Sequence, residues 1–305
     1  MRPTLLVLAS TYPRWENDPE PGFVHELCRR LARSFDVVAV VPDAPGAAPS
    51  GMLDGVEVLR YRYAPRKLQT LVNNGGIATN LKRSLWKWLL VPGFIAGQYF
   101  AARRVMRTRH VDAVHAHWLI PQGWIARLLL RRNGAPFVVT SHGGDLFGFR
   151  GKALQAIKRN VAQASAAMTV VSSAMRDEVE RLGLHPSRLV VLPMGVDLQH
   201  RFVADADAKR HGQQLLFVGR LVPKKGLPYL LHALPKVLAT RPGVTLKIVG
   251  FGPERSALMA LAAQLGIDAR VEFCGAVSQP ELPALYRQAS VFVAPFIRDE
   301  SGNQE

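Results

Sequence analysis

The sequence is poor in cysteine and has no long apolar run at its start, and both shortages exclude classes of protein. Only two of its 305 residues are cysteine, Cys28 and Cys274, and they lie far apart. Nothing in this spacing suggests a disulfide framework or a zinc site, so the composition suits a reducing cytosol. The apolar start, residues 4–10, is too short for a signal-peptide core and cleavage site and is better explained as the first strand of an α/β sheet.

Acidic residues are also scarce. Lys and Arg number 39 against 23 Asp and Glu, which gives a net charge of +16. Between Val58 and Val111 there are eleven basic residues and no acidic one. Nucleic acid would suit such a charge, but no recognised nucleic-acid-binding motif accompanies it, so we expect no nucleic-acid partner.

An apolar segment, residues 85–100, lies inside this basic block and contains Trp86 and Trp88. Lys87 and a predicted break at Pro92–Gly93 argue against a membrane-spanning helix. Tryptophan beside Lys and Arg, next to apolar surface, suits a protein that lies on an anionic membrane face. The alternative is a helical hairpin packed on the sheet with a solvated basic side.

Short apolar runs alternate with amphipathic stretches, which predicts parallel sheets covered by helices on both faces. The predicted strands are 4–10, 36–41, 56–62, 111–116, 137–141, 167–171 and 189–192, then 214–218, 244–249, 271–274 and 291–294. The clearest predicted helices are 22–34, 151–164 and 173–182, then 226–239, 253–265 and 279–288. We therefore expect an α/β protein with two Rossmann-like, doubly wound domains, residues 1–196 and 214–305, joined by a polar linker at 197–213. Two such sheets imply a cleft between them, with ligands beyond the carboxyl ends of the strands.

The most informative segment is 217–226, where a strand runs into a glycine turn that carries Arg220 and Lys225 just before a helix. Backbone N–H groups and the helix dipole favour an anion at such a helix start. Arg supplies a flat bidentate fork and Lys a compact charge, so together they suit a diphosphate leaving group without a metal. The alternative is a solvated basic turn.

Three other loops follow predicted strands. Gly22 opens the first helix and would let backbone amides approach a phosphate. His142 and Asp145 flank two glycines, where they can hydrogen-bond sugar hydroxyls or steer a proton, unless the segment is only a capped turn. The loop with Gly250 and Gly252 starts a helix with proline in its first turn and is by itself only a loop.

Three patterns are set aside. Asp205 and Asp207 resemble a metal–diphosphate motif, but they lie in the polar linker with no strand before them. His115 and His117 share one face of a strand, yet two histidines without a third ligand more often line a cleft or pack than hold a metal. Neither the adjacent serine–serine pair nor the adjacent serine–histidine pair lies in the nucleophile-elbow motif of a serine hydrolase.

Six motifs occur in an order that resembles glycosyltransferase family 4. They are Pro-Gly-Phe-Val at 21–24, Val-His-Ala-His-Trp at 114–118, Ser-His-Gly-Gly-Asp at 141–145, Pro-Met-Gly-Val-Asp at 193–197, Val-Gly-Arg-Leu-Val-Pro-Lys-Lys-Gly at 218–226 and Val-Gly-Phe-Gly-Pro-Glu at 249–254. The resemblance implies the GT-B fold, with the acceptor on the N-terminal domain and the nucleotide-sugar donor on the C-terminal domain.

The resemblance also implies residue roles. His142 would contact the transferred sugar near the reacting carbon, with Asp145 in the same substrate-binding turn. Arg220 and Lys225 would bind the donor diphosphate and stabilise the departing nucleotide, and Gly22 would lie against the same phosphates. The loops expected near the base are those around Gly250, Gly252 and Val277.

One departure concerns the end of the chain. The family places a Glu, seven residues and a second Glu in the donor site, and Glu305 would be the first of the pair. We therefore expect a fragment of a longer protein or a truncated gene product, with an incomplete second domain. A sheet without its terminal strands exposes an edge and apolar surface, so this form should be less stable than its parent and at best weakly active.

The implied activity is transfer of a sugar from a nucleoside-diphosphate sugar to an acceptor hydroxyl with retention of configuration, in surface polysaccharide or glycolipid synthesis. We expect no cofactor and no metal, and an acceptor that is a glycan or a lipid-linked sugar. The protein would be cytoplasmic and peripheral on the inner, anionic face of the cell membrane. Two alternatives stay open: a nucleotide-sugar epimerase on the same fold, and a catalytically impaired fragment that binds nucleotide or membrane.

Overall fold

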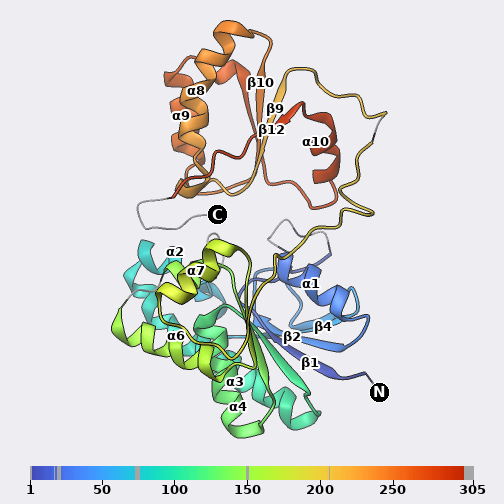
Figure 1. Cartoon of the computed structure of the whole chain (residues 1–305), viewed down its shortest axis with the longest axis vertical. Coiled ribbons are helices and arrows are strands. Elements are labelled where there is room, and N and C mark those ends of the chain that lie inside the picture. Colours follow the sequence, from blue (N-terminus) through green and yellow to red (C-terminus); the bar gives the residue numbers. More distant parts are fainter. Residues whose placement is uncertain are drawn as a thin grey trace. The chain divides into compact units, whose positions relative to one another are not determined.

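A computed structural model describes residues 2–16, 18, 22–72, 76–148, 151–205 and 207–298. The chain divides into two compact units, Met1–Met194 and Gly195–Glu305. The predicted polar linker, 197–213, falls within the second unit by this division. Figure 1 shows that each unit has a sheet with helices packed on it.

The N-terminal unit is built on an eight-stranded sheet in the order β3-β4-β2-β1-β5-β6-β7-β8. The strands are β1 (Thr4–Leu8), β2 (Asp36–Pro42), β3 (Ser50–Leu53), β4 (Val56–Tyr61), β5 (Ala113–His117), β6 (Phe137–Ser141), β7 (Ala167–Val170) and β8 (Leu189–Val191). All neighbouring strands are parallel except β3, which pairs antiparallel with β4 at the edge. The predicted parallel sheet is therefore present.

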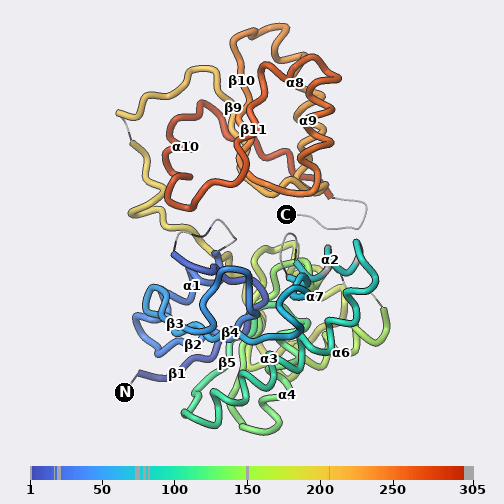
Figure 2. The backbone as a smooth tube through the Cα atoms, turned by 180° about the vertical axis from the view of Figure 1, so that it is seen from behind, coloured from blue at the N-terminus to red at the C-terminus, as the bar shows by residue number. Residues whose placement is uncertain are grey.

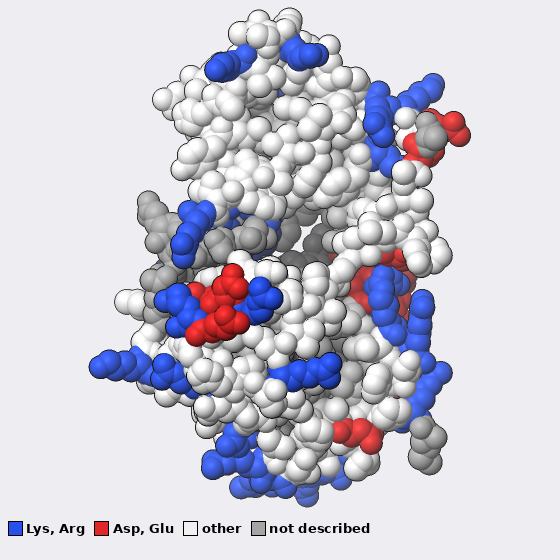
Figure 3. All heavy atoms as spheres, in the orientation of Figure 1, with Lys and Arg blue, Asp and Glu red and all other residues white. Residues whose placement is uncertain are grey.

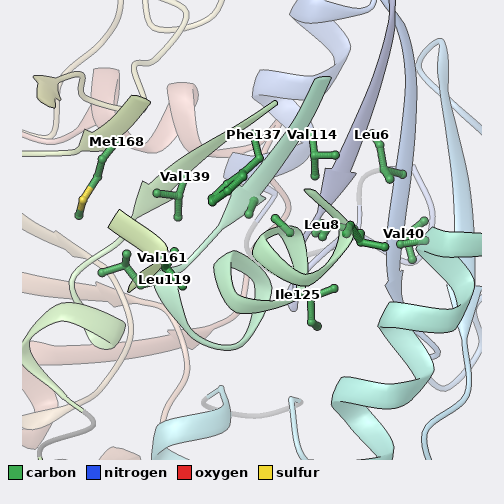
Figure 4. Close-up of a cluster of buried hydrophobic side chains, with 14 of the residues drawn as sticks. Leu6, Leu8, Val40, Val114, Leu119, Ile125, Phe137, Val139, Val161 and Met168 are labelled. Carbon is green, nitrogen blue, oxygen red and sulfur yellow. The ribbon is translucent and has the colours of Figure 1, made fainter. Parts of the chain in front are cut away.

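Helices cover both faces of this sheet. They are α1 (Phe23–Leu31), α2 (Ile77–Arg83), α3 (Leu90–Thr108), α4 (Trp124–Asn133), α5 (Gly144–Phe147), α6 (Lys152–Ala164) and α7 (Ser173–Arg181), with short turns η1 (Arg66–Leu68), η2 (Leu85–Leu89) and η3 (Leu119–Gly123). Alternate residues of β1 point to opposite faces: Leu6 belongs to a core cluster with Ile125 and Val161, and Val7 to a second cluster with Val24. Figure 4 shows the first cluster, in which Leu6 and Val114 lie on neighbouring strands. Burial on both faces explains why the strands are almost wholly apolar.

The predicted break at Pro92–Gly93 is wrong, because α3 runs through both residues. Pro92 lies in the first helical turn, where backbone N–H groups have no partner within the helix, so the missing N–H costs little. A Cβ on Gly93 would lie 2.4 Å from the carbonyl oxygen of Tyr63, so this glycine lets α3 lie against the chain that follows β4. Among the described residues, no helix is long and apolar enough to cross a membrane.

The C-terminal unit has a smaller, all-parallel sheet in the order β11-β10-β9-β12. Its elements are β9 (Gln214–Val218), η4 (Pro223–Lys225), α8 (Leu227–Thr240), β10 (Thr245–Val249), α9 (Arg255–Gln264), η5 (Asp268–Arg270), β11 (Val271–Gly275), α10 (Leu282–Gln288) and β12 (Val291–Phe292). Figure 2 shows α8 and α9 on one side of these strands and α10 on the other. Phe217 packs with Leu231 and Leu258 on the first side, and Leu216 packs with Leu285 on the second.

Candidate functional site

A cluster of three histidines forms at the carboxyl ends of β5 and β6. His115 and His117 lie on β5, and His142 is the first residue after β6. Parallel pairing sets His117 opposite Thr140, so His142 emerges beside it, and Nδ1 of His117 lies 3.0 Å from Nε2 of His142. The strand pairing thus joins two motifs that lie 25 residues apart in sequence.

Aromatic rings surround His142. Its ring centroid lies 5.0 Å from that of Phe23, the first residue of α1, and 4.9 Å from that of Trp118, which follows β5. Segments after β1, β5 and β6 therefore meet at one edge of the sheet. This is the edge where doubly wound sheets bind their ligands.

Asp145 holds the turn that carries His142. Its side chain is buried, and its Oδ1 accepts hydrogen bonds from the Ser141 hydroxyl at 2.9 Å and from the His142 backbone N–H at 3.2 Å. Oδ2 accepts the backbone N–H of Leu119 at 2.6 Å, which ties this turn to the segment after β5. Burial raises the pKa of Asp145, and the hydrogen bonds that it accepts oppose the rise. Both carboxylate oxygens therefore bind protein groups that position this turn, and the expected contact of Asp145 with a sugar hydroxyl stays a prediction.

The histidines are neutral rings at neutral pH. Burial lowers the pKa of His142 to about 3 and the pKa of His115 to about 4. Burial also lowers the pKa of His117 well below its usual value, and the neighbouring histidines lower it further. A neutral His142 can donate or accept one hydrogen bond at a sugar oxygen, but it carries no positive charge toward a substrate.

The two β5 histidines, which the sequence analysis set aside as a weak metal motif, are engaged with protein groups. Nε2 of His115 lies 2.7 Å from the Thr140 hydroxyl, and Nδ1 of His117 faces His142. Within the described ranges, no group of three or more His, Cys, Asp or Glu side chains could hold a metal ion.

Gly22 lies at the N-terminus of α1, as the phosphate-binding role requires. Its carbonyl accepts the N–H of Glu26 at 2.8 Å, and its φ of −93° is one that any residue adopts. The backbone conformation therefore does not explain why this residue is glycine. Its expected contact with the donor phosphates stays a prediction.

The second candidate site is the turn after β9. Arg220 follows the strand, Lys225 ends η4, and Gly226 caps α8 with a left-handed φ of 65°. A Cβ on Gly226 would lie 1.9 Å from the carbonyl oxygen of Pro295, so only glycine fits here. Nζ of Lys225 lies 4.0 Å from the ring centroid of Phe296, a distance at which a cation is attracted to an aromatic face.

The glycine loop after β10 packs directly on this turn. A Cβ on Gly250 would lie 1.9 Å from the carbonyl oxygen of Gly219, and one on Gly252 would lie 2.3 Å from that of Leu221. The backbone N–H of Leu221 donates to the carbonyl of Phe251 at 3.0 Å. Because the two glycines have no Cβ, the backbone of this loop contacts the backbone of the turn after β9 directly. This contact fixes the turn that carries Arg220.

The structure brings Arg220, Lys225, Gly250 and Gly252 to the carboxyl edge of one sheet. Val277, in the loop after β11, is half-buried and packs against the small cluster around Leu216. Glu305 lies outside the described residues.

The sequence analysis missed two residues near the carboxyl edges of the two sheets. It gave no functional role to His117, whose partner depends on how β5 and β6 pair. It also gave no role to Glu254, which follows the second glycine loop. Burial raises the pKa of Glu254, and its Oε2 is buried without a hydrogen-bond partner among the residues that the structure describes. For Glu254, the only signal in the sequence was that a charged residue directly follows a glycine loop.

The sequence matches the Glycosyltransferase Family 4 profile over residues 23–200 and the Glycosyl transferases group 1 profile over residues 212–304. The chain therefore belongs to glycosyltransferase family 4, which confirms the resemblance seen in its motifs.

Several relatives with assigned activities align with most of the chain. Glycogen synthase of Mycobacterium tuberculosis (strain CDC 1551 / Oshkosh) is 28% identical over 291 residues, covering 89% of this chain and 67% of that protein. D-inositol 3-phosphate glycosyltransferase of Salinispora tropica is 27% identical, covering 92% and 62%. The GDP-mannose-dependent alpha-(1-6)-phosphatidylinositol monomannoside mannosyltransferase of Mycolicibacterium smegmatis is 32% identical, covering 55% and 46%. The chain thus spans about half to two thirds of the length of these relatives.

Solved structures share the fold. Anabaena Alr3699/HepE in complex with UDP and glucose superposes with a TM-score of 0.67 at 15% identity, covering 95% of this chain and 73% of that one. A UDP-forming trehalose-phosphate synthase from Burkholderia xenovorans gives a TM-score of 0.65 at 15% identity, covering 97% and 79%. These similarities confirm the predicted α/β, GT-B type of fold, with a smaller sheet in the second unit.

Proposed function

We propose that this chain provides the acceptor domain and part of the donor domain of an enzyme that moves a hexose from a nucleoside-diphosphate sugar to an acceptor hydroxyl, with retention of configuration. The observation that carries the proposal is the turn after β9, where Arg220 and Lys225 stand at the carboxyl edge of the sheet in a chain of family 4. The names of the relatives support the donor class, since one is a GDP-mannose-dependent mannosyltransferase and one structural neighbour is a complex with UDP and glucose.

The two cations suit the chemistry of the leaving group. When the bond between the sugar and the diphosphate breaks, negative charge builds up on the diphosphate oxygens. Fixed positive groups that are already in place stabilise that charge without reorganisation, which lowers the barrier and needs no metal. The glycine contacts around Gly226 and Gly250 keep the turn rigid, so Arg220 and Lys225 keep their positions. His142 would orient the transferred sugar.

The test is the binding of UDP and GDP to Arg220→Ala and Lys225→Ala, measured by calorimetry. Loss of one charge-assisted contact should weaken binding of the preferred diphosphate by about tenfold or more. In a transfer assay with UDP-glucose or GDP-mannose, Arg220→Ala should lower kcat by roughly 100-fold, as removal of one charge-stabilising donor does in other enzymes. Arg241→Ala, an exposed arginine just after α8, is the matched control and should bind and react as wild type.

Unchanged diphosphate binding in Arg220→Ala, with an unchanged melting temperature, would contradict the proposal. Product analysis separates transfer from the epimerase alternative, because a transferase joins the sugar to the acceptor and an epimerase releases a free altered sugar.

We also propose that the acceptor is a glycan or lipid-linked sugar at an anionic membrane on the cytoplasmic side. The support is η2, in which four of the five residues are exposed apolar side chains. Their exposed fractions are 80% for Leu85, 45% for Trp86, 50% for Trp88 and 81% for Leu89. Arg83 and Lys67 are exposed in neighbouring segments. Apolar and indole side chains flanked by cations suit the boundary between lipid headgroups and acyl chains.

The fold separates the basic residues between Val58 and Val111 into groups that lie in different places. Lys87 holds η2 to the chain, because its Nζ donates to the Thr70 carbonyl and the Asn80 side chain. Arg104 and Arg107 are exposed in the last turns of α3, far along the helix from η2. Figure 3 shows Lys and Arg gathered at the end of the N-terminal unit where α3 and α4 lie. Only the cations near η2 therefore belong to the proposed membrane face.

Sedimentation with lipid vesicles tests this part. The chain should sediment with vesicles that contain phosphatidylglycerol. With vesicles of neutral phosphatidylcholine it should remain in the supernatant. A Trp86→Ser/Trp88→Ser double variant should lose most of this binding. Phe100→Ser, which removes an aromatic side chain that is 61% exposed on α3, is the control and should keep it. Equal binding to neutral and anionic vesicles would remove the proposal.

A further inference from the structure

We propose that His117 is a positioning residue that keeps the ring proton of His142 on Nδ1, so that His142 presents an N–H group, not a lone pair, to the donor sugar. This inference rests on the proposed function, in which His142 contacts the transferred sugar. It assigns a role to His117, a buried side chain to which the sequence alone gave none.

The two rings meet edge to edge. Their planes differ by 15° and their centroids lie 5.2 Å apart, while Nδ1 of His117 and Nε2 of His142 are only 3.0 Å apart. Atoms of two rings stacked face to face would stay about 3.5 Å apart, so the rings lie nearly in one plane with the hydrogen bond between their edges. Because both rings are neutral, one of these nitrogens carries the proton and the other accepts with its lone pair.

The second ring nitrogen of His117 sets the direction of this bond. Nε2 of His117 is buried and has no hydrogen-bond partner among the described residues. A buried N–H without a partner is rarer in proteins than a buried acceptor without one. The proton of His117 therefore belongs on Nδ1, from which it is donated to Nε2 of His142. His142 must then carry its own proton on Nδ1.

The surrounding structure holds both rings in this arrangement. The N–H of Trp118 donates to the carbonyl of Thr140 at 2.7 Å, which locks the end of β5 to β6 beside the two histidines. The ring of His115 lies 4.2 Å from that of His117, and Asp145 accepts the backbone N–H of His142. Support of this kind fixes both the orientation and the tautomer of a histidine that contacts substrate. The consequence is that His142 acts as a hydrogen-bond donor to a sugar oxygen and not as a base.

Nitrogen NMR of the full chain without ligand tests the tautomers directly. With ¹⁵N-labelled histidine at pH 7, two-bond correlations show which ring nitrogen carries the proton. We expect protonated Nδ1 and unprotonated Nε2 in both His117 and His142. The signals are assigned by their loss in His117→Asn and in His142→Gln. A proton on Nε2 of His142 would overturn the inference.

Two variants separate positioning from packing. His117→Asn keeps an amide N–H near the place of Nδ1, whereas His117→Phe keeps a ring but has no donor. In the Phe variant no donor fixes the tautomer of His142, so we expect both of its ring nitrogens to be partly protonated and kcat with UDP-glucose or GDP-mannose to fall about tenfold, the effect of one hydrogen bond. The Asn variant should keep the wild-type tautomer and recover most of the activity at a similar melting temperature.

Equal losses of activity in the two variants, with equal melting temperatures and an unchanged tautomer of His142, would also overturn the inference. If His117→Phe does not fold, the spectra of the wild type and the Asn variant still decide. The NMR measurement needs no turnover, so failure of the transferase proposal would not be confused with failure of this one.

Discussion

Acid should destabilise the N-terminal unit, because its three clustered histidines, of which His117 is buried and the other two are half-buried, are held as neutral rings. Burial lowers the pKa of His142 to about 3 and of His115 to about 4, and the pKa of His117 falls well below 6.5. In the unfolded chain each ring would titrate near its usual pKa of about 6.5. Below that pH the unfolded state binds more protons than the folded state, so the free energy of unfolding falls as pH falls.

The size of the effect follows from the same linkage. Between pH 7 and pH 5.5 each histidine that stays neutral in the folded state should cost about 1.3 kcal/mol of stability, and the three together about 4 kcal/mol. Asp145 acts in the opposite sense. Burial raises its pKa, so the folded state takes up this proton at a higher pH than the unfolded chain does and offsets part of the loss in more acidic solution. A loss of about 4 kcal/mol is a large part of the 5–15 kcal/mol that usually stabilises a domain.

Tryptophan fluorescence measures this unit alone. The five tryptophans, at positions 15, 86, 88, 118 and 124, all lie in the N-terminal unit. Urea unfolding at pH 7 and at pH 5.5 gives the change in free energy for the wild type. His115→Gln should reduce that change by about a third, since it removes one of three titrating rings while an amide can still bond Thr140. His185→Gln removes an exposed histidine of the same unit and should leave the change as in wild type.

Equal free energies of unfolding at the two pH values would refute the reasoning. So would an equal loss in the wild type and in His115→Gln, because the pH dependence would then arise elsewhere in the unit.

Two further predictions concern the supports of the two sites. Asp145→Asn places an amide N–H where an oxygen now accepts backbone or hydroxyl donors, so we expect a loss of about 2 kcal/mol in urea unfolding followed by tryptophan fluorescence, and an unchanged midpoint would contradict the role of this carboxylate. Gly250→Ala sets a Cβ 1.9 Å from the carbonyl oxygen of Gly219 and should lower the melting temperature of the C-terminal unit, measured by circular dichroism. The control is Gly266→Ala, at a glycine whose φ of 66° is also left-handed but whose Cβ would meet nothing within 4 Å. We expect the melting temperature to fall further in Gly250→Ala than in this control. Equal shifts in the two glycine variants would show that backbone conformation alone, and not the overlap, is responsible.

The regular elements could be predicted because burial on both faces of a parallel sheet requires almost wholly apolar strands. The bounds expected for β6 and β9 agree with the structure residue for residue. The sequence analysis missed β3, an exposed edge strand of sequence Ser-Gly-Met-Leu, because a strand that is barely buried has no apolar pattern. The error at Pro92–Gly93 has a different cause. Local rules treat a Pro-Gly pair as a break, whereas here the glycine serves a tertiary contact.

The candidate sites could be predicted only as loops at strand ends. The sequence placed His115 and His117 on one face of a strand, but it could not show that His117 bonds His142, because that contact depends on the register of β5 against β6. The same limit applies to Asp145, whose partner Leu119 lies on another segment of the chain. Spacing along the chain indicates which residues leave a strand together, and only the pairing of strands shows which of them meet.

The two sites are supported by different physical means, and this difference explains why they should respond to different perturbations. Around His142 the supports are buried polar groups, Asp145 and His117, whose contribution depends on where protons reside. Around Arg220 the supports are Gly226 and Gly250, where carbonyl oxygens occupy the space that a Cβ would need. A change of pH therefore acts first on the histidine cluster and leaves the glycine contacts intact. A single added methyl group does the reverse, because it displaces the turn that carries the cations without moving any proton.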